Sequence, residues 1–170
     1  TIGNGLPTCT GGFTNSFTYK NWDLSIFLQW SLGNDILNAN RMVFENPAKK
    51  KNTNMFASYA DRWSPENPNS NMPRANALGS NEYSSLYVED GSFLKLKSIS
   101  LGYNFPAQML RKAFISSARV FVSAENIATI TGYSGPDPEV STRNSVLTPG
   151  FDWSAYPRSF NASIGVNLTF

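Results

Sequence analysis

The chain has 170 residues, about the length of one domain, but only 15% of them are charged while 14% are aromatic. Its net charge of +2 does not favour nucleic-acid binding, its single cysteine excludes an internal disulfide, and its lack of histidine removes the commonest general base and metal ligand. We therefore predict no cofactor, no metal site and no enzyme. The longest apolar stretch, 24–32, is far shorter than the roughly 18 residues that a transmembrane helix requires.

Two strands are predicted near the N-terminus, at about 12–20 and 22–33, joined by a very tight turn at Lys20-Asn21. Both alternate between two faces with the period of a strand. In the first, the aromatic residues that share a face are Phe13, Phe17 and Tyr19. In the second, the purely apolar face consists of Trp22, Leu24, Ile26, Leu28, Trp30 and Leu32.

A long loop region follows, at about 34–91. It holds 13 of the 26 charged residues and four prolines, so it is expected to be solvated. A structureless loop of this length is unusual in a compact domain, which suggests that it serves a function. Apolar residues recur inside it at roughly helical spacing, and this predicts short helices over 36–45 and 54–63.

Three more strands are predicted at about 92–105, 117–127 and 158–170, with a second long loop at about 128–157. In the first of them, Ile99, Leu101, Tyr103 and Phe105 share a face. Unbroken alternation gives Lys95 and Lys97 the same parity, further up the strand and beyond its apolar part. The next strand alternates Ala118, Val120, Val122 and Ala124 against Arg119, Phe121, Ser123 and Glu125. The apolar face of the last strand consists of Phe160, Ala162, Ile164, Val166, Leu168 and Phe170.

Short and long connections alternate along the chain, which is typical of outer-membrane barrels with periplasmic turns and extracellular loops. The separation of Phe160 and Phe170 corresponds to roughly 25 Å along the membrane normal, the height of the apolar band of such a barrel. Five strands are too few to close a membrane barrel, since single-chain barrels start at about eight strands. An unclosed sheet in lipid would leave the backbone groups of its edge strands unsatisfied. We therefore expect an all-β fragment of a larger antiparallel transmembrane β-barrel.

Several segments resemble one family of membrane transporters. The sequence DGSFLKLKSISLGYNFP, from Asp90 to Pro106, resembles a signature near the C-terminus of SusC/RagA-type TonB-dependent outer-membrane transporters of Bacteroidetes. The segment AENIATITGYSGPDPEV, from Ala124 to Val140, looks like the strand end and the loop that follow it in that family. The Tyr156-Pro157-Arg158 segment and the opening hairpin are also similar, so the resemblance covers nearly the whole chain.

The resemblance implies that residues 1–170 form the C-terminal part of an outer-membrane barrel of about 22 strands that encloses a plug domain. It further implies a SusD-type surface lipoprotein as a lid, energy from TonB through a segment outside this chain, and glycans or peptides as substrates. The alternative is a soluble β-sandwich that binds carbohydrate. Such a module would bury the apolar face of 22–32 in its own core.

Three groups of residues are candidate functional positions. A signal for barrel assembly, by resemblance, lies in the last strand at Phe170, Leu168 and Val166. Candidate lipid-facing anchors are Trp22, Trp30, Tyr103, Phe160 and Phe170. Loop aromatics that could contact the lid or a substrate, or pack internally, are Phe56, Tyr59, Trp63, Tyr133, Trp153 and Tyr156. The carboxylates of Asp137 and Glu139 alternate with Pro136 and Pro138, which favours a rigid turn over a calcium or acid/base site.

Overall fold

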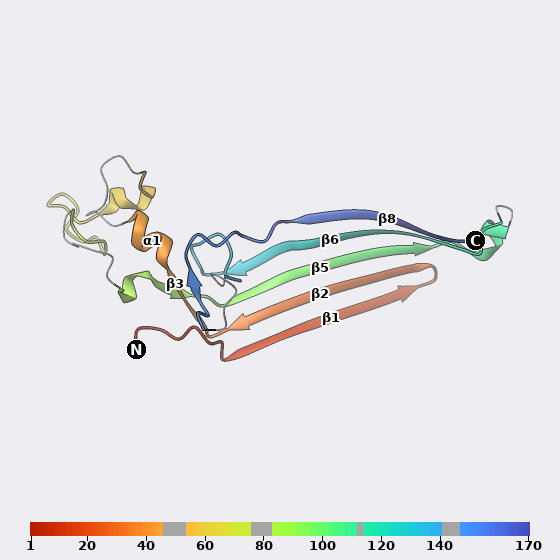
Figure 1. The fold of residues 1–170 in the computed structure, drawn as a ribbon, viewed down its shortest axis with the longest axis horizontal. Helices are drawn as coiled ribbons and strands as arrows, with labels where there is room; N and C mark the ends of the chain where they lie inside the picture. The colour runs from red at the N-terminus through yellow and green to blue at the C-terminus, as the bar shows by residue number, and fades with distance from the viewer. Residues whose placement is uncertain (46–53, 76–82, 112–113, 141–146) are drawn as a thin grey trace. The chain divides into compact units, whose positions relative to one another are not determined.

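The computed structural model describes residues 1–45, 54–75, 83–111, 114–140 and 147–170 (Figure 1). The chain forms two compact units. One, here called the strand unit, comprises Thr8–Leu32, Ser92–Gly132 and Arg158–Phe170, and the other, the loop unit, comprises Thr1–Pro7, Gly33–Gly91 and Tyr133–Pro157. Among the described residues, none of the helices has both the length and the apolar character needed to cross a membrane.

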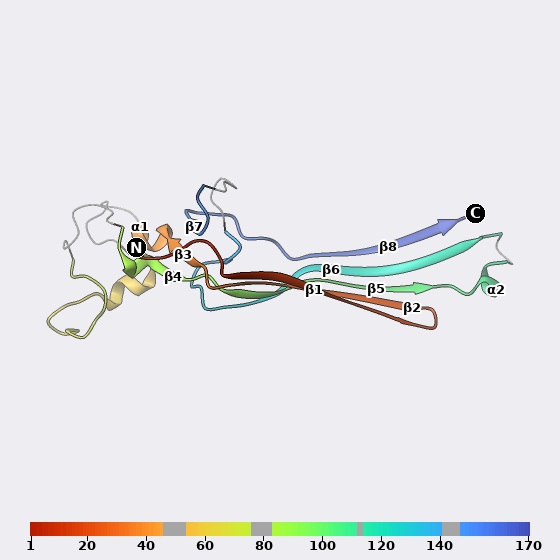
Figure 2. The same ribbon diagram turned by 90° about the horizontal axis from the view of Figure 1, so that it is seen from below.

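The strand unit is one antiparallel sheet with the strand order β1-β2-β5-β6-β8. Its strands are β1 (Cys9–Tyr19), β2 (Trp22–Leu32), β5 (Phe93–Asn104), β6 (Ser117–Thr131) and β8 (Asn161–Thr169). Figure 2 shows these strands as a single layer. The sheet is open over the described residues, since β1 and β8 each pair on one side only. A short helix, α2 (Ala107–Leu110), lies between β5 and β6.

Two strands are longer than the alternation of the sequence indicates. β1 begins at Cys9 because residues 9–11 pair with the end of β2, although Gly11 and Gly12 interrupt the apolar pattern there. β6 continues to Thr131 because its last residues pair with the start of β5. The turn between β1 and β2 has Lys20 at φ 53°, the positive φ that two-residue hairpin loops use.

The register gives the sheet two chemically distinct faces. One row of directly paired residues crosses all five strands on the apolar face and consists of Phe17, Leu24, Leu101, Val122 and Ile164. The neighbouring row lies on the opposite face and consists of Ser16, Ser25, Ser100, Ser123 and Ser163. Ser123 and Ser163 share a hydrogen bond of 2.7 Å between their hydroxyl groups. The row on one face therefore carries only apolar side chains, while the neighbouring row on the other face carries only serine side chains.

A β-bulge in β5 overturns one prediction. The pairing with β2 shifts between Phe27 and Leu28, so that Leu96 rather than Lys97 lies opposite Leu28. Lys95 then pairs with Gln29 on the polar face, whereas unbroken alternation placed it on the apolar face. The Lys95 side chain is 2% exposed, and its Nζ lies 5.6 Å from the centroid of the Phe93 ring. The extra residue thus keeps a cation off the apolar face.

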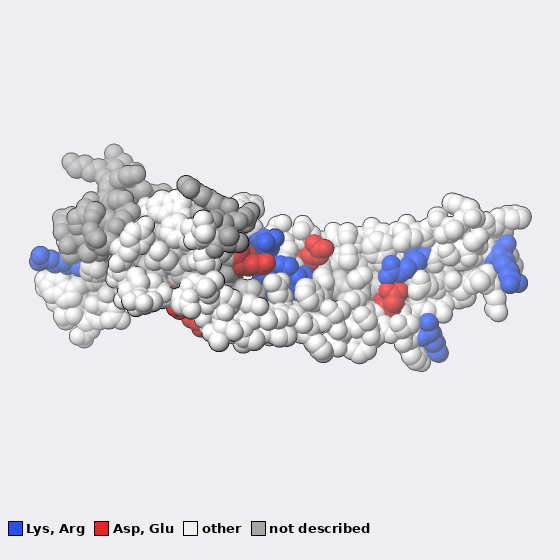
Figure 3. All heavy atoms as spheres, turned by 60° about the horizontal axis from the view of Figure 1, so that its bottom comes forward, with Lys and Arg blue, Asp and Glu red and all other residues white. Residues whose placement is uncertain are grey.

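An ion pair crosses the polar face over a glycine. Arg119 of β6 donates from Nη2 to Asp23 Oδ2 of β2 at 2.5 Å and from Nε to Asp23 Oδ1 at 3.2 Å. The strand between them, β5, carries Gly102 at this point, and a Cβ there would lie 2.5 Å from Arg119 Nη2 and 2.6 Å from Asp23 Oδ2. Gly102 therefore leaves the space that this pair needs. Figure 3 shows how few charged side chains the strand unit carries on the face in view.

The loop unit is built on a three-stranded sheet with the order β4-β3-β7. β3 (Asp35–Asn38) pairs antiparallel with β4 (Val88–Asp90) and parallel with β7 (Phe151–Asp152). The helix α1 (Ala39–Phe44) follows β3, and two short 3-10 helices are η1 (Ala57–Asp61) and η2 (Ser85–Tyr87). α1 is shorter than the helix predicted over 36–45 because residues 35–38 pair in the sheet. The apolar core consists of Ile36, Ala39, Met42, Tyr87 and Tyr133.

Candidate functional site

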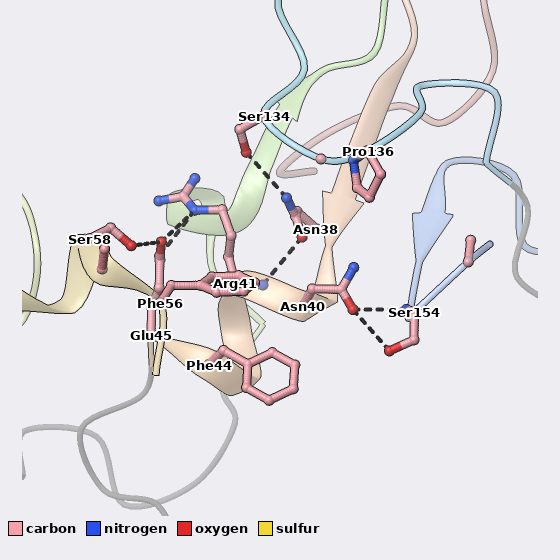
Figure 4. A pocket seen from close by; sticks show the side chains of 13 residues that line it. Asn38, Asn40, Arg41, Phe44, Glu45, Phe56, Ser58, Ser134, Pro136 and Ser154 are labelled. Carbon is pink, nitrogen blue, oxygen red and sulfur yellow. Dashed lines mark hydrogen bonds and ion pairs between the residues drawn. The ribbon is translucent and has the colours of Figure 1, made fainter. Parts of the chain in front are cut away.

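A cavity of about 920 Å³ lies within the loop unit (Figure 4). Its walls come from α1 and the residue before it, from 56–58, from 134–136, and from 154–155. The lining side chains that Figure 4 labels are Asn38, Asn40, Arg41, Phe44, Glu45, Phe56, Ser58, Ser134, Pro136 and Ser154. The site therefore joins segments that lie far apart in the sequence.

Glu89 of β4 links two of these segments to its own strand. Its carboxylate accepts hydrogen bonds from Arg41 Nη1 at 2.8 Å, from the Ser134 backbone N–H at 2.8 Å and from the Ser134 hydroxyl at 2.9 Å. Asn38 Nδ2 also donates to Glu89 Oε1, at 3.3 Å. The Asn38 Oδ1 caps α1 by accepting from the Arg41 backbone N–H at 3.2 Å. Glu89 thereby joins β4, the start of α1 and the segment after Tyr133.

Arg41 makes a second ion pair along α1. Its Nε lies 3.0 Å from Glu45 Oε2, and the Ser58 hydroxyl donates to Glu45 Oε1 at 2.6 Å. Burial would lower the pKa of the Arg41 guanidinium, but its hydrogen bonds with Glu45 and Glu89 raise that pKa above its ordinary value. Burial would likewise raise the pKa of the Glu89 carboxyl, but the hydrogen bonds from Arg41 and Ser134 lower it below the usual range. Arg41 and Glu89 are therefore both charged at neutral pH.

Tyr133 and Asp152 form a second buried polar contact. The Tyr133 hydroxyl donates to Asp152 Oδ2 at 2.5 Å, and the other carboxylate oxygen accepts from the Ala155 N–H at 3.2 Å. The two residues are 6% and 0% exposed. Burial, together with the hydrogen bond to Asp152, raises the pKa of the Tyr133 phenol well above its usual range. Tyr133 thus packs inside the loop unit. Internal packing is one of the roles that the sequence leaves open for the loop aromatics, beside contact with the lid or with a substrate.

The remaining walls of the cavity are aromatic and amide groups. The rings of Phe44 and Phe56 lie with their centroids 5.3 Å apart at an interplanar angle of 42°, a favourable tilted geometry. Asn40 Oδ1 accepts from the Ser154 N–H at 2.8 Å and from the Ser154 hydroxyl at 3.2 Å. These contacts hold an aromatic wall and an amide wall around one space.

Of the six loop aromatics singled out from the sequence, only Phe56 lines this cavity. The Tyr59 ring packs against the Arg62 guanidinium at 4.9 Å, and Trp63 borders a smaller cavity of about 310 Å³. Trp153 and Tyr156 are 45% and 92% exposed. Sequence reasoning did not single out Arg41, Glu89 or Ser134, because ion pairs and hydrogen bonds between residues about 45 positions apart leave no periodic signal.

The segment from Pro136 to Glu139 forms the expected turn. Asp137 is 7% exposed, and its Oδ1 accepts the Glu139 backbone N–H at 2.9 Å, as in an Asx turn. Across the described residues, no cluster of three or more His, Cys, Asp or Glu side chains could hold a metal ion.

The candidate lipid anchors lie on, or beside, the apolar face of the strand unit. Trp22 pairs with Tyr103 across β2 and β5, and the centroids of their rings are 4.7 Å apart. Trp30 covers Gly11 of β1 on the same face. Phe160 and Phe170, which flank β8, are 60% and 83% exposed. The ends of neighbouring strands therefore carry exposed or half-buried aromatic side chains.

Comparison with known proteins places this chain beside TonB-dependent receptors, although no family model matches it. It is 37% identical to TonB-dependent receptor P3 of Formosa agariphila, over 99% of this chain and 17% of that receptor. TonB-dependent receptor P26 of the same organism is 33% identical over 99% of this chain and 18% of its own length. TonB-dependent receptor SusC of Bacteroides thetaiotaomicron is 29% identical over 94% of this chain and 15% of the receptor.

Solved structures give the same relationship. A chain of the RagAB peptide transporter matches 95% of this chain with a TM-score of 0.82 and 27% identity, and the chain covers 17% of it. The RagAB peptide importer in its open-open state matches with a TM-score of 0.84. The chain is therefore homologous to SusC- and RagA-type TonB-dependent receptors and spans about 17% of their length. Since these relatives are receptors and transporters, the expectation of a non-enzymatic protein is confirmed.

Proposed function

We propose that this chain is part of a TonB-dependent importer of glycans or peptides in the outer membrane. In this proposal, the strand unit contributes five strands to the wall of a larger plugged barrel of about 22 strands. The loop unit contributes extracellular loops that contact a SusD-type lipoprotein lid or the substrate. TonB would act through a segment outside the chain. Transport would also require the rest of the barrel and the plug.

The observation that carries this proposal is the division of one single-layered sheet into an apolar face and a polar face. The apolar row that crosses all five strands keeps large exposed surfaces, with Leu101 41%, Val122 48% and Ile164 77% exposed. Surfaces of this kind are stable against lipid, and they are costly in water. The open edges at β1 and β8 offer backbone groups that further barrel strands would pair with.

The alternative, a soluble β-sandwich, fits this face poorly. A sandwich buries the inner face of each sheet against a second sheet about 10 Å away. In this chain the corresponding side chains of β8 stay exposed, with Val166 at 58% and Leu168 at 49%. The homology to membrane receptors also favours a barrel segment over a carbohydrate-binding module.

Individual residues receive roles within this proposal. Trp22, Trp30, Tyr103, Phe160 and Phe170 anchor the strands at the lipid interfaces, where amphipathic rings are favoured. Phe170, with Leu168 and Val166, serves as the assembly signal. The contacts to the lid or the substrate are the half-buried Tyr59 and the exposed loop aromatics Phe56, Trp63, Trp153 and Tyr156, while Tyr133 belongs to the core of the loop unit.

The test uses the full-length receptor in its host. Cells that lack its gene, and cells that carry it on a plasmid, are given fluorescently labelled mixtures of peptides and of oligosaccharides. We expect accumulation of one mixture to require the gene and to stop when a protonophore collapses the proton-motive force. Accumulation that is independent of the gene, or a receptor found in the soluble fraction, would refute the proposal.

A further inference from the structure

We infer that the cavity of the loop unit binds an apolar side chain of a peptide, and that it selects peptides over glycans. This inference rests on the proposed import function and deepens it by naming the substrate class. The basis for it is the set of hydrogen bonds and ion pairs that the polar side chains of the cavity wall already form with one another.

Most hydrogen-bonding groups of the charged and polar side chains in the wall are bound internally. Arg41 directs Nε to Glu45 and Nη1 to Glu89, and Glu45 also accepts from Ser58. Asn38 donates to Glu89 and to the Ser134 hydroxyl, each at 3.3 Å. Figure 4 shows the contacts of Glu45 with Arg41 and Ser58 and the contact of Asn38 with Ser134.

A sugar would find few partners in such a cavity. Each sugar hydroxyl that leaves water needs a new hydrogen bond, and an unsatisfied buried hydroxyl opposes binding. Beyond the donors at Arg41 Nη2 and Asn40 Nδ2, a sugar could obtain these bonds only by displacing contacts that the wall side chains already make with one another. An apolar side chain has no such requirement, because it gains free energy from burial alone.

The apolar part of the wall is formed by Phe44, Phe56, Ala57, Pro136 and Ala155. A volume of about 920 Å³ lies within the range of ordinary ligand sites and accommodates a large aliphatic or aromatic side chain with its flanking backbone. The phenylalanine pair can extend its tilted geometry to a third ring. The cavity therefore complements an aromatic or large aliphatic residue.

One polar group of the wall remains suited to peptide backbone. The Asn40 Oδ1 is occupied by Ser154, while the Asn40 amide nitrogen has no acceptor within the described part of the chain. A single N–H donor beside an apolar space matches a peptide carbonyl next to an apolar side chain. Peptide is also the cargo named for the RagAB transporter, to which this chain is similar at a TM-score of 0.84.

The experiment measures binding to the full-length receptor, purified from outer membranes with any lipoprotein that remains bound to it. The probes are an alanine hexapeptide, the same hexapeptide with one phenylalanine, and maltohexaose. Ala57→Trp fills the cavity, and Ala60→Trp is the matched control, because Ala60 lies in the same 3-10 helix, is exposed and does not line the cavity. Phe56→Ala removes one aromatic wall.

We expect the phenylalanine peptide to bind about 10- to 100-fold more tightly than the alanine peptide, as burial of one large side chain predicts. Ala57→Trp should abolish this preference, Phe56→Ala should reduce it, and Ala60→Trp should leave it unchanged. Equal binding of the two peptides, tighter binding of maltohexaose, or an undisturbed preference in Ala57→Trp would overturn the inference. A receptor that still shows gene-dependent uptake in the host would then retain its proposed function, so the two failures can be distinguished.

Discussion

In the strand unit, five strands repeat one arrangement, with mostly apolar side chains on one face and mostly polar side chains on the other. In the loop unit, short segments from three parts of the chain are joined by polar groups around the half-buried Glu89 and Arg41 and the buried Asp152. The first unit is specified by a repeating pattern, whereas the second depends on individual contacts between distant residues. Substitutions should therefore act by face in the strand unit and by residue in the loop unit.

The largest effect is expected from a charge on the apolar face. Leu101→Arg places a guanidinium in the middle of the apolar row, and an arginine at the bilayer midplane of a barrel costs about 2–4 kcal/mol. Ser100→Arg, one residue away on the polar face, is the matched control and should cost much less. The measurement is urea unfolding of the full-length receptor in lipid bilayers. Equal losses in the two variants would remove the distinction between the faces.

In the loop unit, the corresponding change is the loss of one carboxylate. Glu89→Ala leaves Arg41 with one ion pair and removes the acceptor of the Ser134 N–H and hydroxyl. Because removal of one partner of a partly buried pair leaves unsatisfied groups, we expect local stability to fall by about 2–3 kcal/mol. Amide hydrogen exchange of residues 133–137 reports this loss. Asp61→Ala, in the same unit but outside this network, should leave that exchange unchanged.

The ion pair over Gly102 tests how the pattern of the strand unit accommodates a specific contact. Gly102→Ala forces Arg119 and Asp23 apart, and we expect a loss of about 1–2 kcal/mol in the unfolding free energy. Gly132→Ala is the control, since no atom lies within 4 Å of a Cβ at that position. Similar effects of the two alanines would show that the space above Gly102 is not needed by the pair.

The strand unit could be predicted closely from the sequence because alternation depends only on neighbouring residues. The faces of β1, β2, β6 and β8 follow from it. The alternation rule fails at Lys95, because the extra residue of the β-bulge in β5 reverses which face the neighbouring side chains occupy. Nothing in the local composition marks that extra residue. Most of the loop unit could not be predicted, since Arg41, Glu89 and Ser134 meet only after folding. The tight turn at Asp137 was predictable because its prolines and carboxylate are local.

Acid should weaken the loop unit more than the strand unit. The pKa of Glu89 is lower in the folded protein than its unfolded value of about 4.3, so its contribution is complete at neutral pH. That contribution is lost as the pH falls below about 4 and Glu89 takes up a proton. We expect exchange protection at residues 133–137 to hold from pH 7 to 5 and to decline below that. In Glu89→Gln this decline should be much smaller, and an identical decline would assign the acid sensitivity to another group.

The smallest effect concerns the buried phenol. Tyr133→Phe removes the hydrogen bond to Asp152 but keeps the ring, so the expected loss is about 1–2 kcal/mol at neutral pH. Because the folded pKa of Tyr133 is raised, its contribution is complete below the unfolded value of about 10 and declines as the pH rises beyond it. Tyr133→Phe should therefore remove part of the alkaline sensitivity of the loop unit, measured by exchange of residues 133–137 between pH 9 and 11. Tyr156→Phe is the control, because Tyr156 is 92% exposed and should leave that sensitivity unchanged.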